Sequence, residues 1–212
     1  MSSPSEIWTV VSLLGLILPI YELEKRKNKE KYTQYRSALL CVMFISIITH
    51  SCRLSKSMCL GFDSFYLSKL DAFIVFHVLI EFSSRWFRLT SDIEHIIKLP
   101  LILISLYLIM TQYDINVIFI GISIGIFILS AMVSQIIREN KRGKGYNVDS
   151  INPWKNINLT DNLFGLLFLF LSGIFFYISQ TEDSNFYHGN WHFTASIGFY
   201  FLIKDIPLEN ET

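Results

Sequence analysis

Seven apolar runs occupy most of this chain, and they constrain its fold more than any other feature. They cover approximately residues 7–23, 36–52, 63–82, 94–110, 115–137, 160–179 and 188–204 of 212. Each run approaches the ~17–25 residues that a helix needs to cross the hydrocarbon core of a bilayer. Because a backbone in lipid must satisfy its own hydrogen bonds, such spans form helices. The sequence therefore predicts an all-α membrane protein, a bundle of seven transmembrane helices in one domain over residues 1–212.

The charge composition agrees with a membrane environment. Charged residues make up 17% of the chain, against about 25% in soluble domains. The formal net charge is zero, which removes any broad basic surface and argues against a nucleic-acid partner. The first apolar run lacks a basic leader and a small-residue cleavage motif, so we expect it to remain as a helix. Membrane lipids are the expected surroundings and partners.

Basic residues predict how the helices are oriented. The connections after the first, third and fifth runs, with their flanks, contain thirteen lysines and arginines, whereas the connections on the other side contain two, Arg53 and Lys56. Cytoplasmic loops of membrane proteins are enriched in lysine and arginine. The sequence therefore predicts an N-terminus outside and a C-terminus inside.

Five polar side chains lie within or at the ends of three of these runs, where ionisable groups are costly. They are Ser46, His50, Asp71, His188 and His192. His188 and His192 are four residues apart and share one helical face. Asp71 lies about eight residues into its run, or ~12 Å at the helical rise, close to the depth of the histidines. Three imidazoles with an open fourth position are typical of catalytic zinc, so we predict a Zn²⁺ site with His50, His188 and His192 as ligands.

Such a site has a definite chemistry. Zinc lowers the pKa of a bound water toward ~7 and polarises a carbonyl group. Asp71 could then orient or deprotonate the water, and Ser46 could hydrogen-bond a developing oxyanion or the substrate carbonyl. This arrangement suits hydrolysis of a lipid ester or amide. The competing interpretations are that each histidine is an interfacial polar residue and that Ser46 is a small packing residue between helices.

Two further patterns suggest covalent and quaternary structure. Cys52 and Cys59 flank a short polar loop and could form a local disulfide if that loop faces an oxidising compartment. Cys41 lies in an apolar run, which predicts a small core residue. Gly121 and Gly125 form a G-x-x-x-G motif, which permits close helix packing and is compatible with a homodimer.

At Ser46-x-x-x-His50, Asp71 and His188-x-x-x-His192, the chain resembles the hydrolase-like superfamily of alkaline ceramidases and adiponectin-receptor-type proteins. Within it, the chain is most similar to the branch containing myomaker and the phospholipase that trims GPI anchors. The supporting stretches are Gly15–Pro19, Thr49–Cys52, Met58–Leu60 and Phe186–His192. The resemblance implies a seven-helix bundle, three histidine zinc ligands with the serine and the aspartate beside the metal, and an external disulfide between Cys52 and Cys59. Arg53 departs from this branch, which tends to have an acidic residue there.

The resemblance leads to two functional expectations. The first is a myomaker-like protein of the plasma membrane, or also of the Golgi, that promotes cell–cell fusion of myoblasts, with a possible fusion partner on the cell surface. Only about six residues precede the first run, which favours this role over GPI trimming. The second is a zinc-dependent membrane lipid hydrolase that cuts an amide or ester, with Ser46 and Asp71 as catalytic residues. The site residues themselves favour the second expectation, but the family likeness places the first slightly ahead, with the hydrolase as the alternative.

Overall fold

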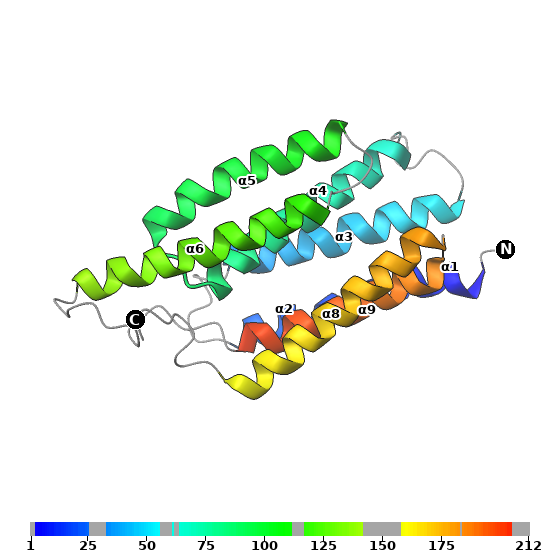
Figure 1. The fold of residues 1–212 in the computed structure, drawn as a ribbon. Coiled ribbons are helices and arrows are strands. Elements are labelled where there is room, and N and C mark those ends of the chain that lie inside the picture. The colour runs from blue at the N-terminus through cyan, green and yellow to red at the C-terminus, as the bar shows by residue number, and fades with distance from the viewer. Residues whose placement is uncertain are drawn as a thin grey trace. The chain divides into compact units, whose positions relative to one another are not determined.

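The computed structural model describes residues 3–25, 33–55, 61, 64–111, 117–141, 158–182 and 184–204, and it is all-α over these residues (Figure 1). A first helical segment comprises α1 (Pro4–Ser12), a 3₁₀ turn η1 (Leu13–Leu16) and α2 (Ile17–Glu24). The others are α3 (Thr33–Ser55), α4 (Ser64–Trp86), α5 (Ser91–Thr111), α6 (Val117–Lys141), α8 (Leu159–Thr181) and α9 (Asn185–Lys204). Each of the seven predicted runs thus corresponds to one helical segment, and the bounds differ by only a few residues.

Local sequence signals explain several helix ends. Ser3 and Glu6 form a capping box: the Ser3 hydroxyl accepts from the Glu6 amide, and the Glu6 carboxylate accepts from the Ser3 amide. Pro4 follows at the first helical position, where its missing N–H costs nothing. Asn158 caps α8 by accepting from the amides of Thr160 and Asp161. These caps satisfy amides that have no partner inside the helix.

Five helices of the described residues are long and apolar enough to cross a membrane. They are Pro4–Glu24, Tyr35–Cys52, Asp92–Thr111, Ile122–Asn140 and Leu159–Ser179. This finding makes the chain a multi-pass membrane protein by helix length and hydropathy. The two helices outside this set, α4 and α9, contain Asp71 and the pair His188 and His192. The crossing of the membrane by all seven helices, and the orientation of the ends, remain predictions.

The chain divides into two compact units, and the division falls within α4. One unit comprises Met1–Ile74 and Asn158–Thr212, and the other comprises Val75–Ile157. All five predicted site residues belong to the first unit.

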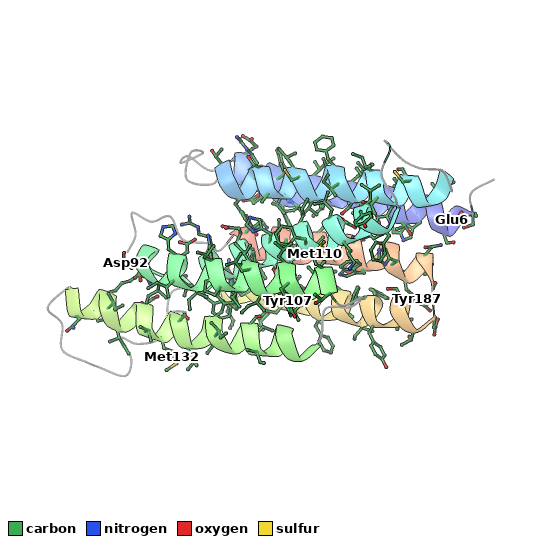
Figure 2. The ribbon with its side chains drawn as sticks, turned by 90° about the horizontal axis from the view of Figure 1, so that it is seen from above. Glu6, Asp92, Tyr107, Met110, Met132 and Tyr187 are labelled. Atoms are coloured by element: carbon green, nitrogen blue, oxygen red, sulfur yellow. The ribbon has the colours of Figure 1, made fainter. Side chains whose placement is uncertain are left out.

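In the first unit, α9 packs against α8 and against the whole first helical segment (Figure 1). The indole N–H of Trp8 donates to Asn190 Oδ1 at 3.0 Å, and the Thr9 hydroxyl donates to the Asn185 carbonyl at 2.7 Å. These bonds join the start of α1 to the start of α9. Figure 2 accordingly shows Glu6 and Tyr187, one on each helix, near the same end of this unit.

Two glycines allow α8 and α9 to approach closely. A Cβ at Gly165 would lie 2.5 Å from the Leu202 side chain and 3.2 Å from the Gly198 carbonyl oxygen, and a Cβ at Gly198 would meet Leu169 at 2.9 Å. Small residues at such contacts are the usual means of packing membrane helices tightly. Gly125, by contrast, has nothing within 4 Å of a Cβ position. Self-association through Gly121 and Gly125 therefore remains a prediction.

The second unit contains the end of α4 with α5 and α6. A group of charged residues joins α4 to α5: Lys98 Nζ lies 2.6 Å from Glu81 Oε2 and also pairs with Glu94, which accepts from the Ser84 hydroxyl at 3.1 Å. The positive charge of Lys98 is paired with the negative charges of Glu81 and Glu94, and buried charges need such pairing to offset their loss of hydration. Tyr107, Met110 and Met132 are exposed on α5 and α6, as suits helices surrounded by lipid (Figure 2).

Candidate metal centre

Three histidine rings meet in the first unit, one from α3 and two from α9. The Nε2 atoms of His50 and His192 are 3.4 Å apart. The His188 ring lies 4.9 Å from the His50 ring and 4.8 Å from the His192 ring, measured between centroids. One ring nitrogen of each histidine lies within 4.8 Å of the others. The predicted convergence of His50, His188 and His192 is therefore present in the structure.

The start of α9 explains why two of these histidines act together. The helix begins at Asn185, three residues before His188, so both histidines are within regular helix, and the His188 amide donates to the Ser184 carbonyl. A spacing of four residues then places both rings on one face. His192 and His50 are buried, and His188 is half-buried. Two neutral imidazoles at this distance can share one N–H···N hydrogen bond, and the three ring nitrogens together could hold one metal ion.

The separation of the His50 and His192 ring nitrogens fits a tetrahedral metal ion. Two imidazole nitrogens at ~2.05 Å from a tetrahedral zinc are ~3.4 Å apart, and the His50–His192 separation is 3.4 Å. Imidazole is a good ligand for zinc, copper, iron and nickel. The donor set therefore fits a first-row metal ion.

Asp71 and Ser46 lie beside this cluster. Asp71 Oδ2 is 3.8 Å from His50 Nε2, the same nitrogen that faces His192. The Ser46 hydroxyl donates to Asp71 Oδ1. Ser46 is fully buried, and the Asp71 side chain is 15% exposed. The carboxylate of Asp71 thus has one oxygen on the buried serine and the other toward the histidines.

Two tryptophans near the histidines were not identified from the sequence. Trp191 contacts the rings of both α9 histidines. Trp8 packs on Gly189, where a Cβ would lie only 2.5 Å from the indole. Trp191 precedes His192 directly and follows His188 by three residues, so its position beside the histidine face was available from helical spacing. The contact between Trp8 and Gly189 was not, because it joins segments far apart in the chain.

Cys52 lies one half-turn beyond His50 in α3 and is disulfide-bonded. Its predicted partner, Cys59, lies outside the described residues. Cys41 is a free and exposed cysteine, so it is not the buried core residue that the apolar run predicted.

Fold and site together define an all-helical, multi-pass membrane protein with a buried cluster of three histidines suited to a metal ion. Over residues 5–193, the chain matches the model of a family described as "Protein of unknown function (DUF3522)", and it belongs to this family. The matched range includes every residue of the candidate site. No curated protein matches the chain.

Proposed function

We propose that His50, His188 and His192 bind a zinc ion and that the site hydrolyses an amide or ester bond in a membrane lipid. The observation that best supports this proposal is the 3.4 Å separation of the His50 and His192 Nε2 atoms, with the Asp71 carboxylate 3.8 Å from the same His50 nitrogen. Three imidazoles leave a fourth tetrahedral position open, which distinguishes catalytic from structural zinc sites. When bound, zinc supplies a Lewis acid that polarises a carbonyl and acidifies a water molecule.

In this proposal, Asp71 is the general base. Its Oδ2 faces the histidines, so it is the oxygen placed to accept a proton from a water molecule at the cluster. The water oxygen forms a bond to the carbonyl carbon, and the bond from that carbon to the amide nitrogen or ester oxygen breaks. The proton held by Asp71 passes to the leaving amine or alcohol. Water and one lipid thus give a carboxylic acid and an amine or an alcohol.

Ser46 has a positioning role in the same proposal. Its hydroxyl has a single hydrogen, and the hydrogen bond to Asp71 Oδ1 uses it. The same hydrogen is then not available for a developing oxyanion. We therefore infer that Ser46 orients the Asp71 carboxylate toward the histidines instead of stabilising the oxyanion itself.

The first test is the metal content of the protein purified in detergent. We expect about one zinc per chain, the stoichiometry of a site with three protein ligands, and loss of that zinc in His192→Ala. His95→Ala is a matched control, because His95 is an exposed histidine of α5 in the second unit. Equal zinc content in His192→Ala and in the unmodified protein would contradict the metal site.

The second test is lipid turnover. The zinc-loaded protein is incubated with ceramides, phospholipids and GPI lipids, and released fatty acid is measured against Asp71→Asn and His192→Ala. A general base contributes about 10²–10⁴-fold to a rate, so we expect Asp71→Asn to retain zinc and lose most activity. If the unmodified protein and both variants release fatty acid from all three lipid classes only at the background rate, the hydrolase proposal is contradicted.

A fusion function in the plasma membrane is the second proposal, and the resemblance to the myomaker branch at the site motifs and along the first helix supports it. Expression in fibroblasts that are mixed with myoblasts is the direct test. Multinucleated cells containing both markers are the expected result, and surface display without fused cells would contradict this function. The His188→Ala and His192→Ala variants in the same assay determine whether fusion requires the metal.

A further inference from the structure

Trp191 is the one side chain of the described residues that has ring contacts with both histidines of α9 without itself being a histidine of the cluster. Its ring centroid lies 4.4 Å from that of His192, with 30° between the planes, and 5.0 Å from that of His188, with 75° between the planes. The indole of Trp191 thus lies roughly along the His192 ring and meets the His188 ring edge-on.

The helical position of Trp191 accounts for both contacts. At about 100° per residue, His188 and His192 differ by about 40° around α9, and Trp191 lies about 60° from His188 on the side away from Gly189. Trp8 covers Gly189, where a Cβ would lie 2.5 Å from its indole. Trp191 therefore borders the histidine face directly, whereas Trp8 contacts α9 at Gly189 beyond that face.

The indole of Trp191 is itself supported from α8. The Phe176 ring lies 4.7 Å from it, with 56° between the planes. A contact of this kind restricts movement of the indole away from the histidines. The support comes from the helix that packs most closely on α9, through Gly165 and Gly198.

We propose that Trp191 is a positioning residue that holds the His188 and His192 rings in the orientation in which their nitrogens converge with His50. This proposal rests on the proposed metal site. Metal-bound histidines are generally oriented by a partner of the ring, and loss of that partner weakens metal binding. The indole acts by contact: it fills the space into which the imidazoles would otherwise rotate, and its π face favours an imidazole that gains positive charge on metal binding.

The test compares Trp191→Leu, Trp191→Phe and Trp8→Leu in the full-length protein. Zinc affinity is measured by competition with a chelator, and site geometry by the visible absorption of bound Co²⁺, which is intense only for tetrahedral coordination. We expect Trp191→Leu to lose about 10–100-fold in zinc affinity, the usual effect of removing a partner that orients a ligand, and to lose Co²⁺ absorption. Trp191→Phe retains an aromatic ring, so we expect it to keep most of the zinc affinity and most of the Co²⁺ absorption.

Trp8→Leu is the matched control, because Trp8 also packs on α9 but at Gly189, Asn190 and Phe193. We expect it to retain the zinc affinity and the Co²⁺ spectrum of the unmodified protein. If Trp191→Leu does not fold, Phe176→Ala provides the second variant, since it withdraws support from the indole without touching a histidine. We expect Phe176→Ala to bind zinc more weakly than the unmodified protein.

The outcomes separate the two proposals. An unmodified protein that binds no zinc would overturn both the metal site and the role of Trp191. Zinc binding by the unmodified protein, with the same affinity and the same Co²⁺ spectrum in Trp191→Leu, would overturn the role of Trp191 alone. Equal losses in Trp191→Leu and Trp8→Leu would also overturn it, since any damage to α9 packing would then suffice.

Discussion

His50 joins the two halves of the candidate site. Its Nε2 faces His192 at 3.4 Å and Asp71 at 3.8 Å, so one imidazole nitrogen lies between a histidine of α9 and the proposed base. The Ser46 side chain lies one turn earlier on the same helix and donates to the far oxygen of the aspartate. A single turn of α3 therefore supplies both a proposed metal ligand and the hydroxyl that donates to the Asp71 carboxylate.

Ser46→Ala tests whether Ser46 orients the Asp71 carboxylate. We expect the variant to retain zinc and to lose activity, because Asp71 Oδ1 loses a hydrogen-bond donor and the carboxylate can turn. Loss of a buried donor costs about 1–3 kcal/mol, so the unfolding temperature should also fall. Ser12→Ala is the control, since Ser12 is equally enclosed but donates to a carbonyl of its own helix, that of Thr9. Loss of zinc in Ser46→Ala would contradict this assignment.

The α8–α9 pair determines where His188 and His192 lie, and two glycines set its separation. Gly165→Ala forces a Cβ to within 2.5 Å of Leu202, whereas Gly173 on the same helix has open space around its Cβ position. Overpacking costs about 1–3 kcal/mol, while glycine to alanine in an open helix gains up to about 1 kcal/mol. We expect thermal unfolding in detergent to shift down for Gly165→Ala and up for Gly173→Ala. Shifts of the same sign would refute this account of the packing.

The α1–α9 contact can be tested by a double-mutant cycle. Gly189→Ala places a Cβ 2.5 Å from the Trp8 indole and should destabilise the protein, because the aromatic ring has to move and its bond to Asn190 is strained. Trp8→Leu removes the obstacle. We therefore expect Gly189→Ala to cost less in the Trp8→Leu background than alone, with a coupling energy of about 0.5–3 kcal/mol. Additive costs would mean that the two residues do not interact.

The number of membrane crossings in the whole molecule depends on whether α4 and α9 cross. Five helices meet the length and hydropathy expected of a span, and the two other helices hold Asp71, His188 and His192. Polar and ionisable groups in membrane helices usually face the protein interior and mark functional positions. The low apolarity of α4 and α9 is therefore compatible with spanning, provided that their polar faces are enclosed by other helices.

An epitope tag in the connection 142–157 distinguishes the two possibilities. If all seven helices cross and the N-terminus is outside, this connection is inside, as its arginines and lysines predict. If α4 and α9 do not cross, the same connection is outside, although the chain ends remain on opposite sides. We expect antibody to reach this tag only after permeabilisation, and an N-terminal tag before it. Staining of the connection in intact cells would exclude the seven-span arrangement.

The sequence alone predicts the helices and the three histidines that meet in the candidate site. Helix length, apolar runs and caps are local properties, which is why seven runs predicted seven helical segments with bounds off by only a few residues. The pairing of His188 with His192 is local as well, because a spacing of four residues imposes one face on any helix. Asp71 and His50 were grouped with them by estimated depth in the membrane.

Only the tertiary structure decided which side chains touch across helices. The 3.4 Å approach of His50 to His192, the hydrogen bond from Ser46 to Asp71, and the contacts of Gly165 and Gly189 all join residues at least 25 positions or a whole helix apart. Such contacts depend on the rotation and separation of packed helices, which hydropathy does not specify. The same reason explains why the closely packed glycines proved to be Gly165 and Gly198, which no local motif distinguished from the open position at Gly125.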